Sequence, residues 1–339
     1  MFDILKDLCE INAVSGDEGA VRDYVKAALK GVECEIKTDN SGNLIVYKKG
    51  KAKPKNKLMI CAHMDEVGFI VTGINQDGFV SLSAVGGVSD SVVYGRKIRF
   101  KSGVAGVLGG KPVHQLNAEE KEKQPKLSSL FADIGAASKA DAEKHISLGD
   151  VAYFTSEYAE TGTDCIMGKA IDDRLGCALM LDLLMNESEY DMHFVFTSQE
   201  EVGARGAEVA AYALKPDMAL ILEATTACDI PDIKDEKQVC KLNGGAVIPF
   251  MDKGAVYDKE LYKSAFDTAA ENNIKCQTKT QIAGGNDSQS IHKTAGGIRT
   301  ICISVPCRYL HSPACMINKN DVNEMKKLTI KMINKMVEL

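Results

Sequence analysis

The chain has 339 residues, of which 45% are hydrophobic, and a formal net charge of −6. This length allows a large buried core and suits two domains better than one. The acidic balance, with no basic stretch that stands out, argues against a nucleic-acid or anionic-membrane partner. No apolar run in the sequence reaches membrane-spanning length, which excludes a membrane-spanning helix.

The cysteines and the first residues indicate the compartment. The count of eleven is odd, no Cys-x-x-Cys motif occurs, and most cysteines lie beside apolar residues, as in LMICA. We interpret them as reduced thiols that fill small spaces in the core. The start MFDILKDLCE has no basic leader followed by an apolar core. We therefore expect a cytoplasmic protein.

The first part of the chain alternates between helix and strand patterns. Apolar residues recur at helical spacing over residues 2–11 and 18–30, and Ser15 is a plausible cap for the second helix. Residues 42–49 (GNLIVYKK) and 58–62 (LMICA) predict strands, the second of them buried. This alternation indicates an α/β domain.

Residues 66–163 have a different pattern. Apolar and polar residues alternate with period two, glycine is frequent, and turn sequences such as NQDGF interrupt the runs. This indicates several short antiparallel strands, with an exposed loop at residues 118–126. We predict that the segment is a small β-barrel domain inserted into the first domain, which then comprises residues 1–65 and 164–339.

After residue 164 helix and strand patterns alternate again. The predicted helices cover residues 172–186, 203–214, 258–273 and 320–339, and the predicted strands cover residues 193–198, 218–224 and 300–305. The first of these helices is expected to be amphipathic. Strands that alternate with helices predict a mostly parallel sheet with helices on both faces. The fold class is therefore α/β, with an inserted β domain.

Four predicted strands run into side chains that can bind a metal. These side chains are His63 after LMICA, Glu200 and Glu201 after FVFTS, Glu223 after MALIL, and His311 a few residues after TICISV. Burying such groups costs free energy unless they are paired or bind a metal. In open α/β sheets the ligand crevice lies beyond the carboxyl ends of the strands, so these four strand ends should converge on one site.

A further pair of carboxylates, Asp172 and Asp173, lies at the start of a predicted helix, where alone it would serve as an N-cap. Beside the four strand ends it becomes a candidate for the same site. Two imidazoles and several carboxylates, without clustered thiolates, favour zinc, cobalt or manganese in a hydrolytic site. The inventory fits a two-ion arrangement. Its ligands would be Asp172 as the bridge, His63 with Glu223, and His311 with Glu201.

Two carboxylates remain, Asp65 and Glu200. Asp65 is two residues from His63, close enough to hold the second ring nitrogen and fix its tautomer. Glu200 adjoins the predicted ligand Glu201 but should point differently, near a metal-bound water as general base. Alone, QEEVG would suit a polar loop that caps the next helix. We interpret the remaining histidines as surface or capping residues: His114, His145, His193 and His292.

Eight motifs together resemble one enzyme family, and they occur in that family's order. They are VSGDEGAVRDYV, DNSGNLIV, CAHMDEVGFIV, DIGAASKADAEKHISLGD, GKAIDDRLGC, FTSQEEVGARGA, GGNDSQSIH and RYLHSP. The family is that of the metallo-aminopeptidases that form tetrahedral particles (TET). It includes glutamyl and deblocking aminopeptidases, and some members are labelled cellulase M or endoglucanase. The resemblance covers nearly the whole chain and is highly specific as a set.

The resemblance implies the same site. Carried over by position, the family's base is Glu200, its orienting carboxylate is Asp65, and its metal ligands are His63, Asp172, Glu201, Glu223 and His311. It implies a dinuclear-metal exopeptidase fold with two divalent ions per subunit and a cis peptide between Asp172 and Asp173. It also implies a homo-oligomer, expected to be a dodecamer built from dimers, in which the inserted domain helps assembly and encloses the active sites.

Two positions depart from the family's pattern. Glu223 stands where the family usually has an aspartate, and Cys315 and Met316 stand where an acidic or aliphatic pair is more frequent. The longer Glu223 side chain bears on metal affinity and on the preferred ion. Activity is still expected, and the departures bear on metal choice and substrate preference.

We expect an aminopeptidase that removes N-terminal residues from short peptides by attack of a metal-bridging hydroxide on the first peptide carbonyl. Glu200 would take the proton and pass it to the leaving amine. An alternative is a glycosidase acting on β-glucans, which would need two carboxylates and no metal and would leave the histidines without a role. The third interpretation is a non-catalytic assembly protein, against which the intact ligand set argues.

Overall fold

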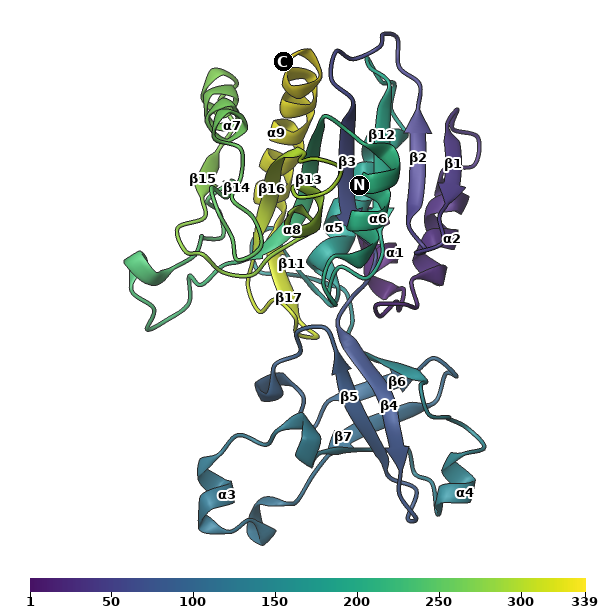
Figure 1. Cartoon of the computed structure of the whole chain (residues 1–339). Helices are drawn as coiled ribbons and strands as arrows, with labels where there is room; N and C mark the ends of the chain where they lie inside the picture. The colour runs from purple at the N-terminus through teal and green to yellow at the C-terminus, as the bar shows by residue number, and fades with distance from the viewer.

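The computed structural model describes residues 1–339, except for the side chain of Glu120. Its central feature is an eight-stranded sheet (Figure 1). In spatial order the strands are β1 (Glu35–Thr38), β2 (Leu44–Lys48), β12 (Met192–Thr197), β3 (Leu58–His63), β13 (Met218–Thr226), β16 (Arg299–Cys307), β14 (Ala246–Ile248) and β15 (Cys276–Thr278). The four central strands β12, β3, β13 and β16 are parallel, as predicted, and antiparallel pairs flank them.

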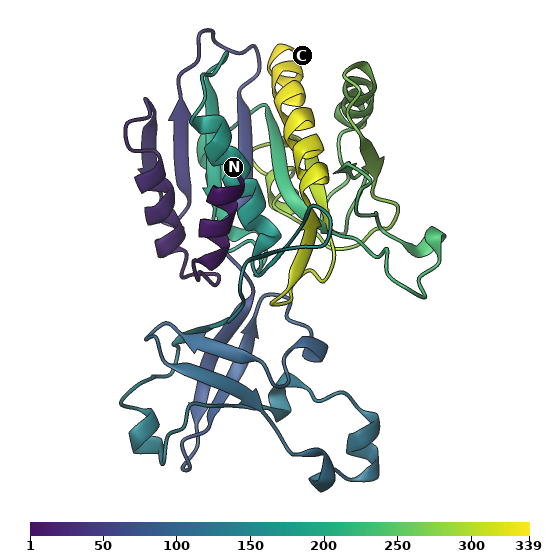
Figure 2. The ribbon, with the colours of Figure 1, turned by 180° about the vertical axis from the view of Figure 1, so that it is seen from behind.

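Helices cover both faces of this sheet. They are α1 (Phe2–Glu10), α2 (Gly19–Ala28), α5 (Ile171–Leu184), α6 (Arg205–Leu214), α7 (Lys259–Glu271), α8 (Ser288–Ile291) and α9 (Lys319–Glu338). Figure 1 shows α6 in front of the sheet, and Figure 2 shows α1 and α9 in front of the opposite face. The α/β fold class predicted from the sequence is thereby confirmed.

The packing of the core shows that α5 is not amphipathic, contrary to the prediction. Every residue of β3 is buried because helices cover both sides of the central strands. Helix α5 was expected to be amphipathic, but all its residues except Asp182 and Leu183 are buried. It contacts β3 and β13 on one side and α1 on another, so it has almost no solvent-facing side. All eleven cysteines are free, and seven of them are buried.

A closed six-stranded barrel lies between β3 and α5 in the chain. Its strands are β4 (Gly68–Ile74), β5 (Val80–Val85), β8 (Phe131–Asp133), β7 (Ala105–Gly109), β6 (Lys97–Phe100) and β9 (Val151–Phe154). It has an apolar core of its own, which includes Phe69, Phe100 and Phe154. Its first and last strands are neighbours, because β4 pairs with β9. The exact domain boundaries at residues 66 and 163 stay a prediction.

Two short helices decorate the barrel, α3 (Ala118–Glu122) and α4 (Lys139–Ala142). Helix α3 falls in the segment that was expected to be a loop, and both helices lie toward the end of the barrel that faces away from the sheet (Figure 1). A separate three-stranded sheet joins β10 (Ala159–Thr161), β11 (Cys165–Gly168) and β17 (Cys315–Asn318). Strand β17 reaches toward the barrel (Figure 1).

A buried charge cluster fastens α1 where the chain leaves β3. The Lys169 ammonium donates to both carboxylate oxygens of Glu66, at 2.7 and 2.8 Å. The Arg174 guanidinium donates to the carbonyl oxygens of Leu8 at 2.6 Å and Ile11 at 3.0 Å. Because the charges are paired and hydrogen-bonded, their burial is tolerated. The segment that follows His63 is thereby held in place.

Candidate metal centre

The predicted strand ends meet at one edge of the central sheet. His63 is the last residue of β3 and pairs in register with Thr197, the last residue of β12. Glu200 and Glu201 follow three and four residues later in the chain. Glu223 lies on β13, which continues for three more residues to Thr226. His311 lies in the connection between β16 and β17.

Asp172 lies between the two imidazoles. Its Oδ1 atom is 3.4 Å from Nε2 of His63, and its Oδ2 atom is 3.4 Å from Nε2 of His311. Each imidazole faces one further carboxylate. Nε2 of His63 is 3.5 Å from Oε1 of Glu223, and Nε2 of His311 is 3.3 Å from Oε1 of Glu201. The structure thus brings together the five residues that the sequence proposed as metal ligands, in the two predicted halves.

The donor atoms fit two divalent cations. Separations of 3.3 to 3.5 Å exceed ordinary hydrogen bonds between nitrogen and oxygen. Two ligands about 2.1 Å from a tetrahedral ion lie about 3.4 Å apart, which agrees with these separations. In addition, Oδ1 of Asp172 is buried and has no hydrogen-bond partner. Nitrogen and oxygen donors of this kind suit zinc, cobalt or manganese.

Both imidazoles are oriented through their other ring nitrogen. Nδ1 of His63 lies 3.0 Å from the backbone carbonyl oxygen of Asp65, and Nδ1 of His311 lies 3.1 Å from the carbonyl oxygen of Gly87. A ring that donates from Nδ1 to a carbonyl leaves Nε2 free to bind a cation. The sequence prediction gave this role at His63 to the Asp65 carboxylate, but that group is farther away, with Oδ1 at 3.5 Å.

The Asp65 carboxylate instead holds the backbone of the loop after β12. Its two oxygens accept hydrogen bonds from the backbone N–H groups of Glu200 at 3.0 Å and Glu201 at 3.1 Å. The hydroxyl of Ser15 donates to the same carboxylate at 2.6 Å. Ser15 was expected to cap α2 but makes no such bond, because its side chain is engaged here and the N-cap residue is Glu18.

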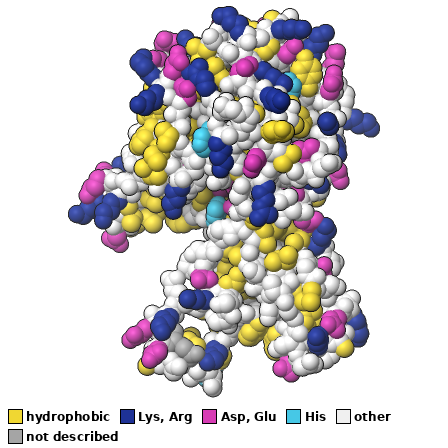
Figure 3. Space-filling model, viewed as in Figure 1, with side chains coloured by type: hydrophobic (Ala, Val, Ile, Leu, Met, Phe, Trp, Pro, Cys, Tyr) yellow, Lys and Arg dark blue, Asp and Glu magenta, His cyan; other side chains and the backbone are white. Residues whose placement is uncertain are grey.

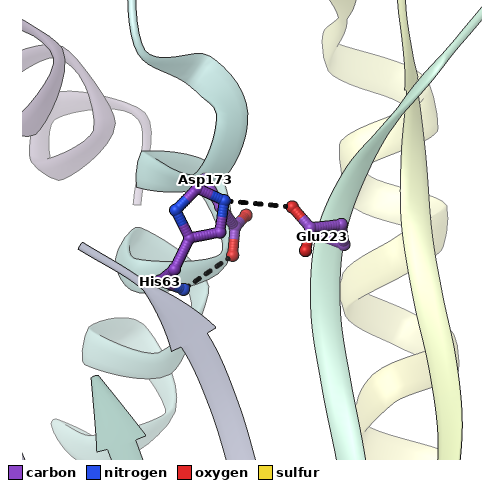
Figure 4. A group of neighbouring side chains, drawn as sticks. All are labelled: His63, Asp173 and Glu223. Atoms are coloured by element: carbon purple, nitrogen blue, oxygen red, sulfur yellow. Dashed lines mark hydrogen bonds and ion pairs between the residues drawn. The ribbon is translucent and has the colours of Figure 1, made fainter. Parts of the chain in front are cut away.

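Asp173 adjoins the site and accepts hydrogen bonds from its backbone. The peptide bond between Asp172 and Asp173 is cis, as the resemblance implied. Figure 4 shows Asp173 beside His63 and Glu223. Its Oδ2 accepts a hydrogen bond from the backbone N–H of His63 at 3.3 Å, and its Oδ1 accepts one from the N–H of Gly176 at 2.9 Å. Asp173, His63 and Glu223 lie close enough to hold an ion, but both oxygens of Asp173 already accept backbone hydrogen bonds, whereas Oδ1 of Asp172 accepts none. We therefore retain Asp172 as the proposed ligand.

Comparison with known proteins identifies the fold and the family. A family model described as M42 glutamyl aminopeptidase matches residues 42–328. The chain belongs to this family. The glutamyl aminopeptidase of Lactococcus lactis subsp. cremoris is 33% identical, over 95% of this chain and 92% of its own. The lysyl aminopeptidase of Pyrococcus furiosus is 32% identical, over 96% of this chain and 95% of its own. Aminopeptidase function follows from this membership.

A solved structure supports the assignment. The TET1 peptidase of Pyrococcus horikoshii, described as able to assemble into a tetrahedron or a large octahedral shell, superposes with a TM-score of 0.86. It is 31% identical, and the match covers 98% of each chain. Among the described residues of this M42 peptidase, no helix is long and apolar enough to cross a membrane.

The electrostatics of the M42 site are dominated by crowded carboxylates. Burial raises the pKa of Glu223 well above its usual range, and the neighbouring Asp173 and Asp172 raise it further. Burial lowers the pKa of His311, but Asp172 and Glu201 outweigh this effect and raise it to about 10. The neighbouring carboxylates act on both pKa values, and bound cations would offset their negative charge.

A cavity of about 430 Å³ opens over the M42 site. Glu200 and the five proposed ligands line it, and so do Lys253, Lys279 and the glycine-rich segment at residues 284–285. Lys279 is only 7% exposed, and its ammonium donates to the carbonyl oxygen of Ala283 at 2.5 Å. The wall of the cavity therefore contains both the carboxylates of the site and two lysines.

Three residues that act on the site received no individual role from the sequence. Asp173 was a candidate for the site together with Asp172, but only Asp172 was given a task. Glu18 accepts a hydrogen bond from the backbone N–H of Gln199 at 3.1 Å, which adds a second support to the loop that carries Glu200. Gly87 acts through its carbonyl oxygen, and the signal available in the sequence was the glycine pair at residues 86–87.

Proposed function

We propose that the protein is a two-metal aminopeptidase that removes N-terminal residues from short peptides. The observation that supports this most strongly is the position of Asp172, with one carboxylate oxygen 3.4 Å from each imidazole Nε2. A carboxylate placed in this way suits a bridge between two cations. His63 with Glu223 would hold one ion, and His311 with Glu201 would hold the other.

The residues of the chain have distinct tasks in this proposal. Bound divalent ions would polarise the first peptide carbonyl and lower the pKa of the attacking water. Glu200 takes the proton from that water and delivers it to the leaving amine. Burial raises the pKa of Glu200, which suits a group that must both accept and release a proton near neutral pH. Asp65 and Glu18 hold the backbone of the loop that carries it.

The cavity supports a preference for acidic N-terminal residues. The carboxylates at the ligand end attract the free α-ammonium group of a peptide, which favours an exopeptidase over an endopeptidase. Lys253 and Lys279, which also line the cavity, would attract an acidic side chain and repel a basic one. The name of the Lactococcus relative, a glutamyl aminopeptidase, agrees with this preference.

We also propose that the protein is a homo-oligomer, with a dodecamer as the expected form. The assembly described for the Pyrococcus horikoshii TET1 peptidase supports this, because the structural match covers 98% of each chain. The barrel would contribute contacts between subunits and restrict access to short peptides. Positive and negative side chains are interspersed over the face seen in Figure 3, which gives no support to a nucleic-acid partner.

One experiment tests the enzymatic proposal. The chelated protein is assayed on the p-nitroanilides of glutamate, leucine and lysine and on a β-glucan, before and after addition of Co²⁺ or Zn²⁺. We expect no peptidase activity after chelation, recovery with metal, and the highest kcat/KM for glutamate. Chelator-resistant cleavage of the β-glucan would favour the glycosidase, and no hydrolysis of any substrate with metal bound would favour the non-catalytic protein.

A further inference from the structure

The barrel touches the candidate metal centre through a turn that contains Gly86 and Gly87. This turn follows β5 and lies next to the connection between β16 and β17, which carries His311 (Figures 1 and 2). The carbonyl oxygen of Gly87 is 3.1 Å from Nδ1 of His311, a contact between residues 224 positions apart in the chain. None of the ligands proposed from the sequence lies in the inserted segment.

We propose that Gly87 is a positioning residue, which fixes the orientation and tautomer of His311 and so completes one of the two metal half-sites. Nδ1 of His311 donates a hydrogen bond to the Gly87 carbonyl, and Nε2, between Asp172 and Glu201, is therefore the ring nitrogen that faces a cation. This inference rests on the proposed two-metal function and assigns part of the site to the barrel.

The lack of side chains in the turn is a requirement of this contact. A Cβ atom on Gly87 would lie 3.0 Å from Nδ1 and 3.3 Å from Cε1 of His311, so the ring would have to move. Gly86 has φ +81, and a Cβ atom there would lie 2.9 Å from Cγ1 of Val67 and 3.1 Å from Cβ of Glu201. The turn therefore packs against both terminal ligands of the same half-site.

The two half-sites differ in what holds their imidazoles. His63 is oriented by the carbonyl of Asp65, two residues farther along the same segment, so its geometry is local. His311 depends on the barrel, and its side chain is 32% exposed, compared with 2% for His63. A displacement of the barrel should therefore weaken the half-site of His311 and Glu201 and leave that of His63 and Glu223 unchanged.

The test compares Gly87→Ala with Gly73→Ala in the full-length protein. The φ of Gly87 lies outside the left-handed region, so alanine fits its backbone and only the ring is disturbed. At Gly73, in β4 of the same barrel, an added Cβ atom would meet the Ser81 side chain at 3.6 Å, an ordinary contact. Calorimetric titration with Co²⁺ and the visible spectrum of the bound ion measure each site without reference to activity.

We expect wild type and Gly73→Ala to bind two ions alike, and Gly87→Ala to bind one ion normally and the other about 10- to 100-fold more weakly. Equal affinities in Gly87→Ala and wild type, or equal weakening at both sites, would overturn the inference while leaving the two-metal centre intact. Failure of wild type to bind two ions would instead overturn the proposed function, and this inference with it.

A double-variant comparison separates positioning from a general structural effect. His311→Ala removes the ring, so adding Gly87→Ala should change neither the affinity nor the spectrum of the ion that remains. The double variant also has no clash, so it remains measurable if Gly87→Ala alone is poorly folded. Further weakening in the double variant would show that Gly87 acts other than through His311, and would contradict the proposal.

Discussion

The carboxylate of Asp65 accepts a hydrogen bond from the backbone N–H of Glu200 at 3.0 Å. Asp65, two residues after the proposed ligand His63, thus fixes the backbone at the proposed base Glu200. The other oxygen of Asp65 accepts from the next N–H group, that of Glu201. Asp65 consequently holds the backbone of both the proposed base Glu200 and the proposed ligand Glu201, and the backbone sets their relative position.

Replacing Glu200 with glutamine should abolish most turnover. Glutamine keeps the shape and the backbone contacts with Asp65 but cannot accept a proton, so kcat should fall by a factor of about 10² to 10⁴. Metal content should stay at the wild-type value because Glu200 is not a proposed ligand. Glu208→Gln, on the exposed surface of α6, is the matched control and should retain full activity. Near-normal turnover in Glu200→Gln would assign the base elsewhere.

Each imidazole should account for one ion. His63→Ala and His311→Ala each remove one nitrogen donor from a different half of the site, so each variant should bind one divalent ion fewer than wild type. Elemental analysis of protein dialysed against a fixed metal concentration gives the counts. His145→Ala, at an exposed position outside the site, is the control. Loss of both ions from either variant would mean that the halves do not bind independently.

His193 should make the protein sensitive to acid. It was expected to be a surface or capping residue but lies half-buried on β12, where burial and Lys57 lower its pKa from 6.5 to about 4. Below pH 6.5 the unfolded chain binds a proton that the folded chain does not, so stability is complete above pH 6.5 and is lost as pH falls toward 4. The loss is less than about 1.4 kcal/mol per pH unit, because the ring is partly exposed.

The variant that checks this is His193→Gln, which cannot titrate. Urea unfolding at several values from pH 7 to pH 4 gives the free energy of unfolding for wild type, His193→Gln and the exposed control His145→Gln. Relative to wild type, His193→Gln should gain stability as pH falls, and the control should not. A constant difference between His193→Gln and wild type over this range would show that the folded and unfolded pKa values are alike.

The proposed assembly predicts a large particle in solution. Multi-angle light scattering of freshly purified, metal-supplemented protein should give a mass close to twelve times the 36.6 kDa of one chain. If interfaces depend on bound metal, chelation should lower this mass, since ligands that bind only the assembled state stabilise it. A monomer mass with metal present would contradict the assembly and leave the site assignment unaffected.

The sequence predicted the central fold because the signals were local. LMICA, FVFTS, MALIL and TICISV are short apolar runs, and parallel strands bring their carboxyl ends to one edge, so the convergence of His63, Glu223 and His311 followed from topology. The sequence interpretation failed where a residue's role depends on a contact with a residue far away in the chain. Ser15 has a capping residue's chemistry but donates to Asp65, fifty positions away.

Other features left no readable pattern. The burial of α5 on nearly all sides results from α1 packing over it, which the apolar spacing of α5 alone does not reveal. The short strand β14 pairs with β16 through a single register position, Val247 with Ser304, too little to give a periodic signal. Gly87 contributes a backbone carbonyl, an atom that every residue has, and the glycine pair that allows its close approach to His311 does not by itself indicate a partner 224 positions away.

The pairing of β4 with β9 places the two connections of the barrel side by side. The whole insertion therefore leaves and rejoins the catalytic domain at one place, as a long hairpin would. Its outer end, around α3 and α4, can change in length or in surface residues during evolution without altering the spacing of β3 and α5. The inner end has no such freedom, because the glycine turn that closes it lies against Glu201 and His311. Sequence and length should accordingly vary most among related chains at the far end of the barrel. Subunits could then differ in shape there while the metal centre stays the same.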